Sequence, residues 1–192
     1  MNTKLTAAEY NKFIKMIVQG FRALIACYGM TNQSGILAWI LDAFVSCVTG
    51  YNHKKYWQRR AYVINGKQQN ILLKAYYIYY LKRIDAKHLS STGYFYNSGA
   101  VFSTPPHLPH GLNRIIVGHD AKIGANVTFF QGVTVSHGGC IIGDNVVLGA
   151  NCVILPNIRI GDNAKIGANC VVVEDVPNNA TCVMNKPRII KK

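Results

Sequence analysis

Acidic residues are scarce in this sequence. Among its 192 residues, eight Asp and Glu stand against 21 Lys and Arg, which gives a formal net charge of +13. Residues 1–95 carry most of the excess, with thirteen basic and three acidic residues, whereas residues 96–192 carry eight and five. A surplus of this size attracts anionic partners, from nucleic acid and lipid headgroups to acidic polymers and polyphosphate cofactors, and charge alone does not choose among them. We interpret the densest basic run, residues 53–60, as the solvated face of a helix.

Paired cysteines and long apolar runs are also missing. Six cysteines stand alone, at positions 27, 47, 140, 152, 170 and 182, without the spacing of a zinc site or a disulfide framework. The most apolar segment, residues 35–48, is too short to span a bilayer and contains Asp42, and no charged segment followed by an apolar one opens the chain. We therefore expect a soluble protein of the reducing cytoplasm. With 49% hydrophobic residues the chain can bury a core, which excludes disorder.

The N-terminal half is patterned for helices. Residues 6–28 begin with the capping-box spacing of Thr6 and Glu9 and continue with apolar residues at helical intervals. Further helices are predicted over residues 36–48 and 70–84. The last of these segments carries four closely spaced tyrosines, which we expect to pack against other helices, at positions 76, 77, 79 and 80.

From residue 117 onward the helical pattern gives way to a repeat of six residues. Large apolar residues recur with this period, with one extra residue after the fourth: Val117, Ile123, Phe129, Val135, Ile142, Leu148, Ile154, Ile160, Ile166 and Val172. A second, mostly small apolar residue lies two positions before each of them, and both sets are predicted to point inward. Glycine follows six of the large residues, where we expect a tight corner with unusual backbone angles, at positions 118, 124, 143, 149, 161 and 167.

Three six-residue faces make one triangular turn of eighteen residues, so residues eighteen apart stack on successive turns. Cys152 and Cys170 have this spacing, and we interpret them as small interior residues and not as a redox pair. The repeated [LIV]-G-x-x-x-x pattern resembles the hexapeptide-repeat family, whose members fold as left-handed parallel β-helices and associate laterally into trimers. The predicted fold class is therefore α+β: a basic α-helical region, residues 1–95, followed by a left-handed parallel β-helix with a C-terminal tail, residues 96–192.

One branch of that family shares further segments with this chain. They are HGLNRIIVG (110–118), QGVTV (131–135), IGDNVVLGANCVIL (142–155) and KPR (186–188). They resemble the serine acetyltransferases and their relatives that O-acetylate sugars in surface polysaccharides. The resemblance implies an acetyl-CoA-dependent O-acetyltransferase in which His110 is the catalytic base.

Histidine suits this role on chemical grounds. A hydroxyl is a poor nucleophile, and an imidazole with a pKa of about 6.5 can take its proton as it attacks a thioester carbonyl. A backbone N–H can then stabilise the oxyanion, and no covalent acyl-enzyme is required. His107, three residues before His110, has no counterpart role in the family and is expected to pack or to orient the loop.

His137 is the second candidate catalytic residue. It lies in the segment SHGGC (136–140), which contains the extra residue of the repeat and is therefore expected to project from the coil. The serine acetyltransferases carry a second active-site histidine in a longer loop of this region. In the galactoside and antibiotic acetyltransferases, a loop histidine of this region is itself the base.

The acceptor is expected to be a carbohydrate hydroxyl of a surface polysaccharide. The serine enzymes pair their base with an upstream aspartate and hold the ammonium group of serine with acidic residues, yet no Asp or Glu lies between Asp85 and His110. Asn97, Asp120 or a neighbouring subunit would then orient His110. A strongly basic protein suits a sugar better than a cationic amine, and serine is the alternative acceptor.

The acetyl donor is expected to be acetyl-CoA, whose phosphates favour Arg and Lys partners, and no metal is expected. By the resemblance, Ala150 and Ala168 match positions that touch the pantetheine arm through backbone groups. Arg188 matches a CoA-binding arginine, and Lys191 matches a second basic position. Glu174 stands where related enzymes often carry lysine.

Two other functions remain open. The γ-type carbonic anhydrases are hexapeptide proteins that bind zinc through three histidines at a subunit interface, and here His119 and His137 would bind metal with His107 or His110. Alternatively, the coil is a trimerising scaffold whose basic helices bind a membrane surface or nucleic acid. The tyrosines of residues 70–84 argue against an amphipathic membrane helix. We expect no nucleic-acid partner and leave membrane association open.

Overall fold

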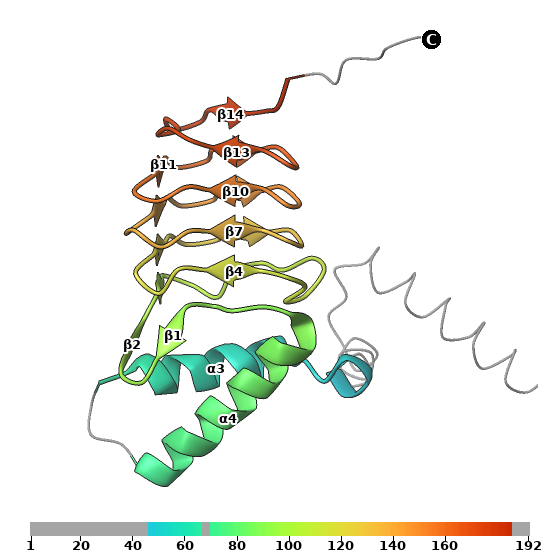
Figure 1. Ribbon diagram of the computed structural model, residues 1–192, viewed down its shortest axis with the longest axis vertical. Helices are drawn as coiled ribbons and strands as arrows, with labels where there is room; N and C mark the ends of the chain where they lie inside the picture. The colour runs from blue at the N-terminus through green and yellow to red at the C-terminus, as the bar shows by residue number, and fades with distance from the viewer. Residues whose placement is uncertain (1–45, 67–69, 186–192) are drawn as a thin grey trace, which may run out of the picture. The chain divides into compact units, whose positions relative to one another are not determined.

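The computed structural model describes residues 46–66 and 70–185 of the chain (Figure 1). The helix predicted over residues 6–28, and nearly all of the one predicted over residues 36–48, lie outside the described residues. Within the described part, no helix combines the length and the apolar character needed to cross a membrane.

The chain divides into two compact units at the junction of Asn52 and His53. In the first unit only residues 46–52 are described, and they start with a helical turn at 46–49. The second unit contains two helices and the repeat region, and it carries every predicted site residue.

Two helices, α3 (His53–Ile64) and α4 (Ile71–His88), pack against each other. α4 begins where the Asn70 side chain accepts hydrogen bonds from two N–H groups of the first turn, at 3.0 and 3.2 Å. It ends at Leu89, whose positive φ of 51° stops the helix. The helix predicted over residues 70–84 is present and runs one turn further.

The tyrosines of α4 are less buried than their spacing suggests. Tyr76 and Tyr79 are 53% and 63% exposed, whereas the Tyr77 ring packs edge-on against Tyr62 of α3, with the ring centres 5.2 Å apart. Tyr80 is half-buried, and the Arg59 guanidinium lies 3.9 Å from the centre of its ring.

The repeat region forms a coil of short parallel strands. A two-stranded antiparallel ribbon of β1 (Tyr94–Phe95) and β2 (Ser98–Gly99) precedes it. The coil has three faces, each a four-stranded parallel sheet, and Figure 1 shows the strands of the first face stacked one above another. The first face contains β4 (Ile116–Val117), β7 (Thr134–Val135), β10 (Val153–Ile154) and β13 (Val171–Val172). The second contains β3 (Val101–Phe102), β5 (Lys122–Ile123), β8 (Ile141–Ile142) and β11 (Arg159–Ile160). The third contains β6 (Thr128–Phe129), β9 (Val147–Leu148), β12 (Lys165–Ile166) and β14 (Thr181–Cys182).

The strand register reproduces the predicted period and its interruption. Val153 pairs with Val171, eighteen residues on, but with Thr134, nineteen residues back. The extra residue therefore lies in the segment 136–140, as the sequence predicts. Helices followed by a parallel β-helix are confirmed as the fold.

Both predicted sets of inward residues are buried. Each of the ten large apolar residues is at most 2% exposed, and the smaller residues two positions before them are at most 7% exposed. Together they form one continuous core cluster. Cys152 and Cys170 are part of this core, as predicted.

Three edges connect the faces of the coil. The first edge consists of residues 118–121, 136–140 and 155–158; the second of residues 124–127, 143–146 and 161–164; the third of residues 130–133, 149–152 and 167–170. The six edge glycines do not have the unusual backbone angles expected of them, because none has a positive φ. Five of the six are needed because the next turn lies too close for a side chain: a Cβ on Gly149 would lie 2.7 Å from the Ile166 carbonyl oxygen, and Gly167 alone has more room.

Asparagines take the positive φ instead. Seven of them do so along the edges of the coil, with φ between 56° and 63°: Asn126, Asn145, Asn151, Asn157, Asn163, Asn169 and Asn179. On the second edge their side chains bond one another from turn to turn, and Asn145 accepts from Asn126 at 3.4 Å and donates to Asn163 at 3.2 Å. Asn tolerates this left-handed conformation better than most L-residues, and on the second edge the asparagines form a ladder.

A buried polar network joins the helices to the first turn of the coil. Arg60 is 2% exposed, and its Nη2 donates to the carbonyl oxygens of Thr92 and Ala100 at 2.8 and 2.7 Å. The Tyr56 hydroxyl donates to Asp85 Oδ1 at 2.6 Å and lies 2.9 Å from Thr92 Oγ1. The basic run that contains Arg60 is therefore only partly the solvated face expected from the sequence.

Candidate active site

His110 lies in the segment that leads from the third face to β4. Residues 109–114 form turns, and the Gly111 N–H donates to the Leu108 carbonyl at 3.1 Å. Leu112 is fully buried and anchors the segment, while Gly111 reverses the chain with a φ of 65°. The His110 imidazole is exposed, with its centre 5.9 Å from that of the Phe130 ring. The anchored loop thus presents an accessible imidazole on the surface of the coil.

His107 belongs to the coil itself. Its N–H donates to the Val127 carbonyl at 2.9 Å, and its own carbonyl accepts from the Phe129 N–H at 3.0 Å. The residue thereby forms a bridge with Thr128 that extends the third face. Its side chain is exposed, and within the described residues no hydrogen bond or ring contact joins it to His110.

Ala150 and Ala168 lie on the third edge, which the His110 segment continues at the first turn. Backbone hydrogen bonds run up this edge from turn to turn, at 2.8 to 2.9 Å: Gly132 N–H to Asn113, Asn151 N–H to Gln131, and Asn169 N–H to Ala150. Ala150 is half-buried and Ala168 is exposed. The structure therefore brings the predicted base and both predicted pantetheine contacts to one edge of the coil.

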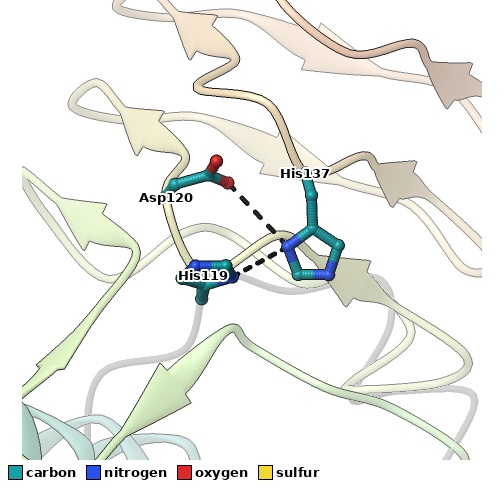
Figure 2. A group of neighbouring side chains, drawn as sticks. All are labelled: His119, Asp120 and His137. Atoms are coloured by element: carbon teal, nitrogen blue, oxygen red, sulfur yellow. Dashed lines mark hydrogen bonds and ion pairs between the residues drawn. The ribbon is translucent and has the colours of Figure 1, made fainter.

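His137 lies on the first edge together with His119 and Asp120 (Figure 2). The Nδ1 atoms of the two histidines are 2.8 Å apart, and Asp120 Oδ1 is 3.9 Å from His137 Nδ1. Asp120 Oδ2 accepts hydrogen bonds from the N–H groups of Gly138 and Gly139, at 2.8 and 2.9 Å. The hydrogen bond from Gly138 is the largest cause that holds the pKa of the Asp120 carboxyl below its usual value, and the bond from Gly139 acts in the same direction. Both glycines have a positive φ, so a glycine turn absorbs the extra residue of the repeat.

The single chain does not bring His110 and His137 together. They lie on different edges, and no hydrogen bond, ion pair or ring contact joins them in the part of the chain that the structure describes. Neither side chain expected to orient His110 contacts it: Asp120 holds the His137 loop, and Asn97 accepts a hydrogen bond from Lys74 Nζ.

The stacking of His119 on His137 follows from their spacing of eighteen residues. The third group beside them is Asp120, and not His107 or His110 as the carbonic-anhydrase alternative required. Sequence reasoning missed this partnership because Asp120 is fixed by backbone N–H groups, which become available only in the glycine turn. Arg188 and Lys191 lie outside the described residues.

The class of protein is defined by the coil and by its repeat. Residues 139–174 match the model of the bacterial transferase hexapeptide family, with six repeats. The match agrees with the six-residue period and with the three parallel sheets of the structure. The resemblance to this family that the sequence predicts is thereby confirmed for the repeat region.

Within this class the chain is similar to the serine acetyltransferases. It is 34% identical over 108 residues to the serine acetyltransferase of Staphylococcus aureus, a match that covers 53% of this chain and 50% of the relative. The serine acetyltransferase of Staphylococcus epidermidis is 35% identical over the same length. The chain thus spans about half the length of the curated relatives it matches.

Solved serine acetyltransferases share the fold. The Neisseria gonorrhoeae enzyme in complex with serine is 30% identical, with a TM-score of 0.52, and the match covers 82% of this chain and 62% of that one. Isoform 3 from Entamoeba histolytica, in complex with cysteine, is 23% identical, with a TM-score of 0.55, and the match covers 95% and 63%. Because these matches cover 95% and 82% of this chain, the likeness extends beyond the coil into the helical region.

Proposed function

We propose that this protein is an acetyl-CoA-dependent O-acetyltransferase of the serine acetyltransferase type, with His110 as the general base. The observation that carries the proposal is the third edge: the turn segment of His110 continues it through Asn113, and Ala150 and Ala168 lie further along it. The chain that builds this edge is 34% identical to serine acetyltransferases over 108 residues. A thioester arm laid along the edge would point its acetyl group toward the imidazole, which is the proximity that acyl transfer needs.

In the proposed reaction, His110 takes the proton of the acceptor hydroxyl as the hydroxyl oxygen attacks the thioester carbonyl carbon. The tetrahedral intermediate then collapses: the C–S bond breaks, and the leaving thiolate takes the proton from the imidazolium. The products are the acetyl ester and CoA with a free thiol. Backbone N–H groups at the edge are the proposed donors to the oxyanion.

Acetyl-CoA is the proposed donor. Ala150 and Ala168 have small side chains that leave the edge backbone accessible to a pantetheine arm. We assign the phosphates to Arg188 and Lys191, because by the resemblance they match basic CoA-binding positions and cationic side chains suit a polyphosphate. The net charge of +13 supports an anionic co-substrate.

His137 is proposed as the second histidine of the active site, contributed by a neighbouring copy. The first edge holds His137 away from the His110 loop of its own chain, so a shared site requires at least two subunits, and we propose a homotrimer or larger homo-oligomer in the cytoplasm. The Nδ1 atom of His137 faces His119 and Asp120. Its Nε2 is therefore the atom proposed to contact the substrate.

Serine is the acceptor that the comparisons favour. The relatives are named serine acetyltransferases, and the Neisseria gonorrhoeae enzyme was solved with serine. They lend no support to the polysaccharide acceptor expected from the charge. A carbohydrate hydroxyl stays the second candidate because, among the described residues, no acidic side chain contacts His110 to hold the ammonium group of serine nearby.

An acetyl-transfer assay tests this proposal. Acetyl-CoA is supplied with L-serine, or with neutral and acidic oligosaccharides, and release of the CoA thiol is followed. We expect acceptor-dependent release by the wild type and a loss of roughly 10²- to 10⁴-fold in kcat for His110→Ala. His107→Ala is the matched control and should keep its activity, since that residue contributes its backbone to the coil. Unimpaired turnover by His110→Ala would show that His110 is not the general base. If the wild type releases no CoA thiol in response to any acceptor, the proposed function is refuted.

A further inference from the structure

The first edge carries a cluster of three side chains, and the proposed acetyl transfer uses only one of them, His137. His119 and Asp120 come from one turn of the coil and His137 from the next, and a ligand atom of each lies within 4.8 Å of the others. Figure 2 shows the His119 ring and the Asp120 carboxylate both pointing toward the His137 ring. All three are exposed, so a bound species would be open to solvent on its outer side.

We propose that His119, Asp120 and His137 bind one divalent transition-metal ion, such as Zn²⁺, at the first edge of each coil. Two imidazole nitrogens and one carboxylate oxygen form a donor set that Zn²⁺ accepts, and solvent would complete the coordination. Ca²⁺ and Mg²⁺ are poor candidates, because they prefer sites made of oxygen ligands.

The distances require only small adjustments. Zn–N bonds of about 2.0–2.1 Å place two nitrogens on one ion roughly 2.9–3.4 Å apart, and the two Nδ1 atoms lie 2.8 Å apart. Asp120 Oδ1 is 3.9 Å from His137 Nδ1. This carboxylate oxygen must move less than about 1 Å toward His137 to share an ion with it.

The ligands are also held in place. Asp120 Oδ2 is occupied by the two glycine N–H groups, which turns Oδ1 toward His137. The Phe95 ring packs edge-on against His119, with the centres 5.3 Å apart. Supporting contacts of this kind orient metal ligands and raise their affinity.

A bound ion would tie two turns of the coil together where the repeat has its extra residue. Coordination through Nδ1 leaves the Nε2–H of His137 as a hydrogen-bond donor, so the ion fixes the orientation of this side chain without taking the atom assigned to substrate. The ion positions His137 and has no part in the proton transfers of the proposed reaction.

Zinc titration of tag-free protein, by calorimetry and by metal analysis after desalting, tests the site. We expect one Zn²⁺ per chain, and His119→Ala, Asp120→Asn and His137→Ala should each weaken binding about 10- to 100-fold. Asp120→Asn keeps an oxygen for the glycine N–H groups and so isolates the loss of the charged ligand. His107→Ala and His110→Ala remove histidines outside the cluster and should keep the wild-type affinity.

Substitution with Co²⁺ separates this site from binding by cysteine. The spectrum should show ligand-field bands without the charge-transfer absorption of a thiolate, although Cys47 is exposed. Thermal unfolding in metal-free buffer verifies that each variant is folded. Wild-type affinity in all three cluster variants, or a thiolate spectrum, would overturn the site, and either readout is independent of acetyl transfer.

Discussion

The interior cysteines show how burial decides the chemistry of a single residue. Cys152 is fully buried and Cys170 is 2% exposed. Burial, together with the neighbouring Cys170, raises the pKa of the Cys152 thiol to about 12. Because the thiolate is the reactive form, this residue is inert at neutral pH in the folded protein. The stacked pair therefore contributes packing to the core and no redox chemistry.

Thiol labelling measures this protection. In native protein at pH 8, iodoacetamide should modify the exposed Cys47 and leave Cys152 and Cys170 unmodified, because neither interior thiol is accessible. Peptide mapping by mass spectrometry locates the label, and labelling in denaturant provides the reference for full reaction. Modification of Cys152 as fast as Cys47, or a native disulfide between Cys152 and Cys170, would contradict the assignment.

The strands of the coil could be predicted from the sequence because a six-residue period reports which side chains point inward. Edge chemistry could not be predicted in the same way. Gly149 is required because the backbone of the adjacent turn lies close to it, and Asn145 donates a hydrogen bond to Asn163 of the adjacent turn. The six-residue pattern describes one turn at a time and contains neither contact. The candidate site was likewise predicted only in part. The extra residue of the repeat located the His137 loop, but the hydrogen bonds that join Asp120 to this loop form only when successive turns stack.

Substitutions at Asn145 separate the two contributions of the asparagine ladder. Asn145→Ala loses the bonds to Asn126 and Asn163 and places a Cβ residue without a polar group at a φ of 56°. We expect the free energy of unfolding to fall by about 2 kcal/mol. Asn145→Gly loses only the bonds and should cost roughly 1 kcal/mol.

Urea unfolding of both variants and the wild type gives these free energies. Equal losses in the alanine and glycine variants would show that the positive φ carries no penalty at this position. A loss in neither would show that the ladder itself contributes nothing to the stability of the coil.

At the scale of the whole molecule, helices and coil are joined through buried charge. Arg60 and Asp85 are 2% and 4% exposed, and Tyr56 and Thr92 lie between them. Burial lowers the pKa of Arg60 to about 10 and raises that of Asp85, because each charged form has lost its hydration. Hydrophobic periodicity gives no sign of this network, since polar residues in a helix pattern predict a solvated face. The junction is thus a polar contact that only the folded chain reveals.

Asp85→Asn tests how this junction responds to pH. A raised pKa means that the folded state binds the Asp85 proton more tightly than the unfolded state does. Its contribution to stability is therefore complete below the ordinary carboxyl pKa of about 3.9 and is lost as the pH rises through the folded-state pKa. Asparagine has no such proton and can still accept the hydrogen bond from Tyr56.

Urea unfolding of both proteins between about pH 4 and pH 8 should show the wild type losing stability relative to Asp85→Asn as the pH rises. A difference that is constant with pH, or that grows in favour of the wild type, would mean that Asp85 is held in its charged form by the network around Arg60.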